Sequence, residues 1–130
     1  MDPFPDTERA LVYLLADLAG GLGSIGTETP ANLGTRAKYV RVRRFGGTDD
    51  GITDLSIMDI DAFATDRTTA IATAEAIRDR LYTGPHHVDG VVLDRVVTST
   101  SPREIPWSGD EVRRWAATYR VTARRTPTPD

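Results

Sequence analysis

The chain lacks cysteine and contains very little lysine and histidine. Its 130 residues hold no cysteine, which excludes disulfide bridges, a zinc–cysteine site and a cysteine nucleophile. Lys38 is the single lysine among 16 basic residues, and the formal net charge is −3. This nearly balanced charge does not indicate a nucleic-acid-binding protein. The two histidines, His86 and His87, are adjacent, and neighbours in an extended chain point in opposite directions, so they do not form a shared metal site.

Long apolar runs are also absent. The most apolar segment, residues 10–22, is too short to cross a membrane and is interrupted by Asp17. The first residues have neither the basic start nor the apolar core of a signal peptide. With 39% hydrophobic and 27% charged residues, we expect an unsecreted, soluble protein with one domain over residues 1–130. The terminal Thr-Pro-Thr-Pro-Asp, residues 126–130, is expected to be a disordered tail.

Hydrophobic periodicity predicts two helices and five strands. The first helix is capped by Asp6 or Thr7 and stops at residues 20–21; the second is capped by Asp66 and ends at residues 84–85. The expected order is α-β-β-β-α-β-β, an α+β fold with a mostly antiparallel sheet of four or five strands and two helices packed on one face. The predicted strands are 25–29, 38–45, 55–64, 88–100 and 115–124, with connections over 46–53 and 101–109.

Motifs for catalysis or cofactor binding lack the context that their chemistry needs. The glycines at 21, 23 and 26 match a dinucleotide-binding pattern, but they follow a helix and precede a weak strand, which favours a simple turn. Asp49, Asp50 and Asp54 do not have the spacing of a calcium loop. The chain has neither a P-loop nor a serine elbow. We therefore expect no enzyme, no cofactor and no metal site.

Charge is segregated along the central part of the chain. Five positive charges fall within residues 36–44, and five negative charges follow within residues 49–61. One interpretation is pairing within a hairpin, since opposite charges on neighbouring strands stabilise a sheet by about 0.2–1 kcal/mol per pair. The other is that each molecule carries a basic and an acidic patch, which favours head-to-tail contacts that close into rings. Nucleic-acid binding is less favoured, because the acidic half repels phosphates.

Three stretches, taken in their order and spacing, resemble the tail terminator proteins of long-tailed bacteriophages, especially those of actinobacterial hosts. The likeness covers residues 6–125. The stretches are Pro30-Ala-Asn-Leu followed by Tyr39-Val-Arg-Val-Arg-Arg-Phe-Gly-Gly-Thr-Asp, then Met58-Asp-Ile-Asp-Ala-Phe-Ala-Thr-Asp-Arg, and finally Arg114-Trp-Ala-Ala-Thr-Tyr-Arg-Val-Thr-Ala-Arg.

This resemblance implies a structural role in the virion. Tail terminators form a hexameric ring on the head-proximal end of the tail tube, stop its polymerisation and join the tail to the head-completion proteins. The implied partners are other copies of the chain, the tail tube protein, a head-completion or connector protein, and genomic DNA that passes through the channel without sequence-specific binding. The implied location is the virion tail, after synthesis in the host cytoplasm, with no membrane partner, cofactor or catalytic residue.

Site residues are predicted from charge and exposure. We expect contacts between subunits or with the tube at Arg41, Arg43, Arg44, Asp49 and Asp50. Trp107 is placed either at a partner contact or folded back on the core. Asp59 and Asp61 are predicted to face the channel, where negative walls let DNA slide. The alternatives left open are a head-completion or connector subunit, a small ligand-binding domain or enzyme, and a DNA-binding domain.

Overall fold

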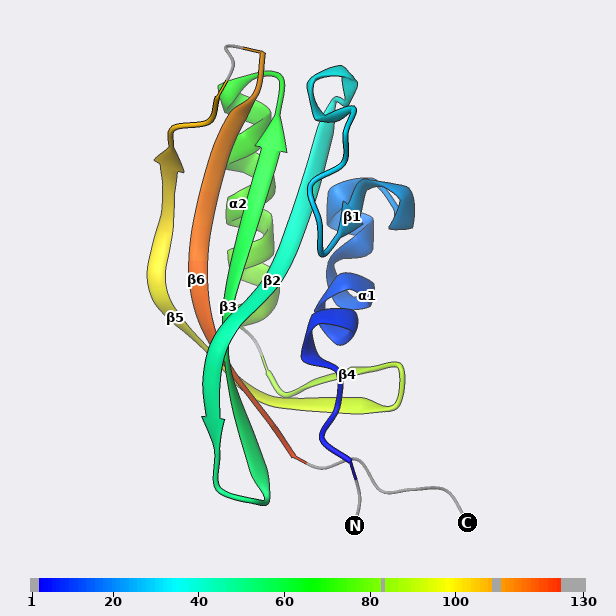
Figure 1. Cartoon of the computed structure of the whole chain (residues 1–130), viewed down its shortest axis with the longest axis vertical. Coiled ribbons are helices and arrows are strands. Elements are labelled where there is room, and N and C mark those ends of the chain that lie inside the picture. Colours follow the sequence, from blue (N-terminus) through cyan, green and yellow to red (C-terminus); the bar gives the residue numbers. More distant parts are fainter. Residues whose placement is uncertain (1–2, 83, 109–110, 125–130) are drawn as a thin grey trace.

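A six-stranded sheet organises the chain in a computed structural model that describes residues 3–82, 84–108 and 111–124 (Figure 1). The strand order is β1-β2-β3-β6-β5-β4; β1 pairs with β2 in parallel, and all other pairs are antiparallel. The predicted tail at 126–130 lies outside the described residues. The elements are α1 (Thr7–Ala19), β1 (Ile25–Gly26), β2 (Lys38–Asp49), β3 (Thr53–Ala64), α2 (Arg67–Tyr82), β4 (His86–Val88), β5 (Val91–Ile105) and β6 (Arg113–Arg124).

Both helices begin at aspartate caps. The Asp6 carboxylate accepts the backbone N–H of Arg9 at 3.0 Å, and the Asp66 carboxylate accepts that of Thr69 at 2.8 Å. Such caps satisfy backbone donors that have no partner inside the helix, and each contributes about 1 kcal/mol. Helix α1 ends at Gly20, whose φ of +104° is readily adopted by glycine. The sequence signals for the start of both helices are therefore confirmed.

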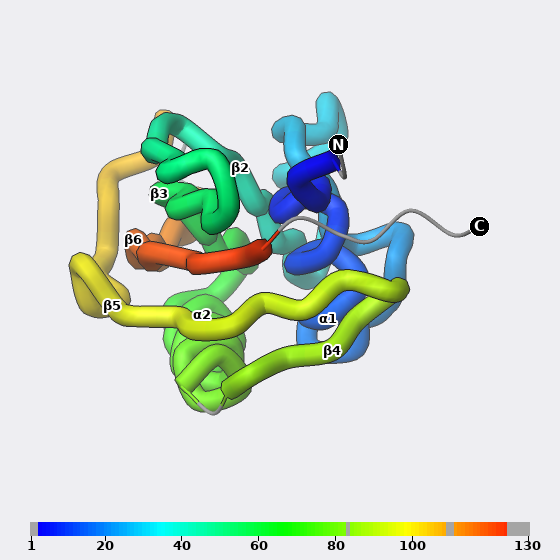
Figure 2. Tube along the Cα trace, turned by 90° about the horizontal axis from the view of Figure 1, so that it is seen from below, coloured from blue at the N-terminus to red at the C-terminus, as the bar shows by residue number. Residues whose placement is uncertain are grey.

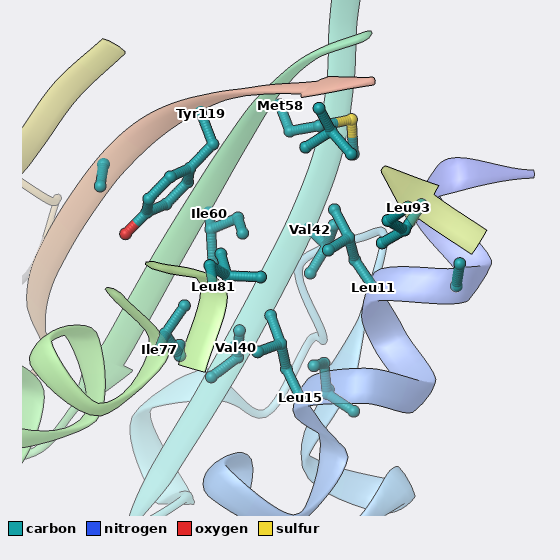
Figure 3. Packing of buried hydrophobic residues seen from close by; sticks show 14 of the residues in the cluster. Leu11, Leu15, Val40, Val42, Met58, Ile60, Ile77, Leu81, Leu93 and Tyr119 are labelled. Atoms are coloured by element: carbon teal, nitrogen blue, oxygen red, sulfur yellow. The ribbon is translucent and has the colours of Figure 1, made fainter. Parts of the chain in front are cut away.

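The main core lies between the helices and one face of the sheet (Figure 3). Alternate residues of β2 and β3 point toward the helices, as strand geometry requires. Burial of each large apolar side chain contributes roughly 1.5–3 kcal/mol. The buried side chains come from α1 (Leu11, Leu15), α2 (Ile77, Leu81), β2 (Val40, Val42), β3 (Met58, Ile60), β5 (Leu93) and β6 (Tyr119, Val121).

The segment predicted as one strand over 88–100 is instead a hairpin followed by a long strand. Asp89 and Gly90 have φ values of +50° and +74°, and these two residues turn β4 into β5. Positive φ at both positions is the geometry of a tight hairpin turn, for which Asp-Gly is a preferred sequence. β5 then continues to Ile105. It passes through Pro102, which lies where the pairing with β6 is irregular, between Thr100 and Arg103. The sheet consequently has six strands rather than four or five, and the order ends in three strands.

The predicted connection over 46–53 is mostly strand. β2 runs to Asp49, and its register with β3 shifts between Arg44 and Gly46, so that Phe45 is an extra residue in the ladder. Gly47 has a φ of +146°, and a Cβ there would overlap the carbonyl oxygen of Leu55. A glycine is therefore required for β2 to stay paired with β3 beyond the bulge.

Candidate assembly surfaces

The end of the β2–β3 hairpin extends past both helices (Figure 1). The hairpin carries two large apolar side chains in solvent: Phe45, near its base, is 60% exposed, and Ile52, at its tip, is 68% exposed. Phe45 is the bulge residue, and Ile52 lies in the turn. The tip of the hairpin therefore offers an apolar side chain, Ile52, that is accessible to another protein.

The hairpin turn is both ordered and acidic. Asp50 Oδ1 accepts the backbone N–H groups of Thr53 at 2.6 Å and Ile52 at 2.9 Å. These hydrogen bonds lower the pKa of the Asp50 carboxyl, because they favour its ionised form. Asp49 Oδ1 accepts the N–H of Gly51 at 3.0 Å. Asp49 and Asp50 are exposed and, among the described residues, have no cation within 4 Å.

Arg44 braces the base of this hairpin. Its guanidinium donates two hydrogen bonds to the Asp54 carboxylate, at 2.9 and 3.1 Å, and its backbone N–H donates to Glu8 of α1 at 3.0 Å. Asp54 is buried, so this pair is partly protected from water. The predicted contact residue Arg44 is thus engaged within its own chain.

A buried ionic cluster occupies the other face of the sheet. Arg41 Nε and Nη2 donate to Asp61 Oδ2 at 3.2 and 2.9 Å, and Arg114 Nε donates to Asp61 Oδ1 at 2.8 Å. The Asp61 side chain is only 1% exposed. The prediction that Asp61 faces a channel is corrected by this burial, and Arg41 is likewise buried rather than available for a partner.

Trp107 covers this cluster. Its ring contacts Phe63 edge to face, with centroids 4.9 Å apart, and the guanidinium groups of Arg41 and Arg114 lie 5.8 and 5.6 Å from it. Phe63 belongs to a second small core with Leu33, Tyr39 and Val112. The indole therefore folds back on the protein and stays partly exposed, as in the second of the two interpretations of Trp107.

The rest of this sheet surface, which we call the open face, lies opposite the helices and carries exposed arginines. Register places Arg43 opposite Asp59, and Arg95 and Arg120 on the same face of β5 and β6. In the described part of the chain these three arginines have no carboxylate within 4 Å. Asp59 is half-buried and accepts a hydrogen bond from the Thr118 hydroxyl at 2.8 Å. The open face is therefore basic.

Some charges of residues 36–61 pair within the chain, as one interpretation expected, and others remain exposed, as the other expected. Arg36 donates to the Gly23 carbonyl at 2.7 Å and Lys38 to the Leu18 carbonyl at 2.9 Å, while Arg41 and Arg44 pair with aspartates. Among the basic residues of the segment 36–44, Arg43 is the one whose side chain has no polar partner within the described part of the chain. The charges that remain exposed belong mainly to Arg43 and to the acidic hairpin turn.

A groove that no sequence motif predicted lies between the end of α2 and the edge of β5. Its apolar side chains are Leu81 and Tyr82 of α2 and Val96 and Val97 of β5, and Arg78 and Arg95 lie beside them. Val97 and Arg95 belong by register to the open face and line the groove from the edge of the sheet. Tyr82 is 84% exposed and Val97 is 40% exposed. A large aromatic residue on the solvent side of a helix end was the available sequence signal.

The described ranges show no clustered metal ligands. They contain no group of three or more histidine, aspartate or glutamate side chains placed to hold a metal ion. His86 is buried with its Nε2 3.2 Å from the Leu81 carbonyl, while His87 is exposed. The glycine pattern at 21–26 forms a short 3-10 turn that leads into β1, so the glycines precede a strand rather than the N-terminus of an α-helix. No helix in these ranges is long and apolar enough to span a membrane.

Comparison with known proteins finds a likeness at the level of the fold. No family model matches the chain, and no curated protein matches it. Among solved structures, it is similar to a chain of the native gene transfer agent (GTA) virion particle, with a TM-score of 0.68 and 16% sequence identity. The match covers 90% of this chain and 93% of the other. The two chains therefore share a fold over nearly their whole lengths.

Proposed function

We propose that this chain is a structural protein of a phage-like virion, and that it forms a hexameric ring that caps the head-proximal end of the tail tube. The observation that carries the proposal is the fold likeness, over almost the whole of both chains, to a component of a virion particle. The sequence resemblance to tail terminators points in the same direction. The proposed partners are other copies of the chain, the tail tube protein and a head-completion protein, with genomic DNA passing through the ring.

The surface of the chain suits a ring subunit. A ring held by head-to-tail contacts needs two different exposed surfaces on each copy. The acidic hairpin turn with Asp49 and Asp50 and the basic open face with Arg43 have opposite charge and lie on different parts of the molecule. We therefore retain Arg43, Asp49 and Asp50 as proposed contact residues.

Asp59 fits a DNA channel less well than the sequence predicted. It is half-buried and shares the open face with Arg43, Arg95 and Arg120. A surface with three exposed arginines attracts phosphates instead of letting DNA slide past. We propose that the open face contacts protein and that other residues line the channel.

Electron microscopy of the purified protein, alone and mixed with tail tubes of the same virion, tests this function. We expect six-fold rings at one end of each tube and no further growth of capped tubes. A monomer that never associates with tubes would contradict the proposal. Rings found at the head portal instead of the tube would identify a connector, and salt-sensitive binding to duplex DNA without rings would identify a DNA-binding domain.

A charge-reversal variant tests the contact residues. Arg43→Glu should weaken ring formation, because Arg43 is exposed and has no polar partner to lose among the described residues. Arg9→Glu is the matched control, since Arg9 is an exposed arginine on α1 whose ion pair with Asp89 is long, at 3.7 Å. Equal assembly of both variants would remove Arg43 from the interface while leaving the ring itself in place.

A further inference from the structure

The groove between α2 and β5 has the chemistry to bind an apolar side chain flanked by acids. Leu81 and Val96 are the more buried of its apolar side chains, while Tyr82 and Val97 stand in solvent. Arg78 and Arg95 add two positive charges beside them. Arg95 has no hydrogen-bond or ion-pair partner among the described residues, and the contacts of Arg78 with Ser101 and Glu75 are long, at 3.5 and 3.7 Å.

The edge of β5 beside this groove is poorly suited to pairing with another strand. Its register with β6 shifts between Leu93 and Arg95 and again between Thr98 and Thr100. Bulges of this kind twist an edge away and prevent regular pairing with an incoming strand. A partner on this side of the sheet is therefore recognised by side-chain contacts rather than by extension of the sheet.

The tip of the β2–β3 hairpin is complementary to the groove. Ile52 is exposed to solvent beside the acidic residues Asp49 and Asp50, whose carboxylates accept backbone N–H groups of the turn. The groove has the matching arrangement, an apolar surface next to two arginines. The hairpin tip also extends away from the body of the molecule, so it can reach a neighbour (Figure 1).

We propose that the hairpin tip of one copy docks in the α2–β5 groove of the next copy, with Ile52 against Val97 and Tyr82, and with Asp49 and Asp50 facing Arg78 and Arg95. This inference rests on the proposed ring and gives the hairpin tip a definite partner surface: the β5 edge of the open face, at Arg95 and Val97, together with the end of α2. The tip lies on the far side of β6 from α2, so a chain does not fill its own groove (Figure 2). A contact between two different surfaces repeats from copy to copy and produces a ring when the rotation closes.

Cysteine cross-linking tests the contact directly, because the chain has no cysteine of its own. Ile52→Cys and Val97→Cys proteins are prepared separately, mixed and oxidised. We expect a disulfide-linked heterodimer in the mixture, and a ladder up to the full ring from a chain that carries both cysteines. Tyr13→Cys, at an exposed site on α1, replaces Val97→Cys as the control and should give little cross-linking with Ile52→Cys.

A second experiment removes the negative charge of the turn but keeps its hydrogen-bond acceptors. Asp49→Asn with Asp50→Asn keeps side-chain oxygens that accept the turn's N–H groups, and we expect assembly weakened at least about tenfold, because close charge pairs at interfaces carry such coupling. Asp49→Arg and Arg95→Asp should each abolish rings, whereas the two changes together in one chain should restore them.

The outcomes separate this contact from the proposed function. If rings form, yet Ile52→Cys cross-links no better to Val97→Cys than to Tyr13→Cys and the charge variants assemble normally, the docking contact is wrong and the ring stands. If the unmodified chain forms no ring either alone or with tubes, and no cross-link appears, both are wrong.

Discussion

Replacement of Asp61 by asparagine is the most direct test of how the chain is held together outside its main core. Asp61 accepts three N–H bonds from two arginines, Arg41 on β2 and Arg114 on β6. The asparagine side chain would have nearly the same shape but no charge. The two guanidinium groups would then face each other without a counter-ion, and Trp107 would cover a cluster that carries two unbalanced positive charges.

The expected cost follows from the burial of the cluster. The Arg41 side chain is 9% exposed and that of Arg114 is 21% exposed, so water reaches Arg114 better than Arg41. Removing one partner of a buried ion pair typically costs about 3–5 kcal/mol, and the access of water to Arg114 places Asp61→Asn at about 3–4 kcal/mol. A domain of this size has about 5–15 kcal/mol of stability in total. We therefore expect a fall of roughly 10–20 °C in Tm.

Urea and thermal unfolding measure the effect, and Asp59→Asn is the matched control. Asp59 lies two residues away on the same strand and face, but its partner is the Thr118 hydroxyl, so its loss should cost only about 1 kcal/mol. A triple replacement of Arg41, Asp61 and Arg114 by apolar residues should recover most of the loss, because it leaves no unpaired charge. If Asp61→Asn costs no more than Asp59→Asn, the ionic cluster does not stabilise the fold.

Three further predictions concern the hairpin and the tryptophan. Gly47→Ala places a Cβ against the Leu55 carbonyl at a strained positive φ, and should cost about 1–3 kcal/mol, with faster amide exchange confined to the hairpin; exchange equal to wild type would contradict it. The pKa of Asp50 is lowered in the folded chain, so its carboxylate stabilises the turn at pH values above the unfolded pKa of 3.8 and loses that effect as the pH falls through the folded pKa. Protection of the Thr53 amide from exchange should therefore drop below about pH 4, and Asp50→Asn should abolish this pH dependence. Trp107→Ala should cost about 1–3 kcal/mol in thermal unfolding and leave the proposed tail joining unchanged, since the indole packs inward. Loss of that joining at unchanged stability would place Trp107 at a partner contact instead.

Short-range sequence signals predicted most of the elements. Asp6 and Asp66 begin the two helices as expected, and the alternation over 115–124 corresponds to β6. The β4–β5 hairpin was missed because the Val- and Thr-rich composition of 88–100 outweighed the Asp89–Gly90 turn signal. β5 also continues through Pro102. This is possible because β5 is an edge strand at that point: it pairs with β6 on one side, and no neighbouring strand on the other side requires a backbone N–H donor.

The sequence by itself determined the helices, the alternation of the strands and the order of the charges, since each of these depends on residues close together in the chain. It could not determine which charges remain free. Arg41 and Arg43 share one face of one strand, yet Arg41 is buried against Asp61 and Arg43 is exposed. The difference arises because Trp107 and Arg114, more than sixty residues further along the chain, cover Arg41 and do not extend to Arg43. Only the tertiary structure decides this, because burial depends on which distant segments pack over a side chain.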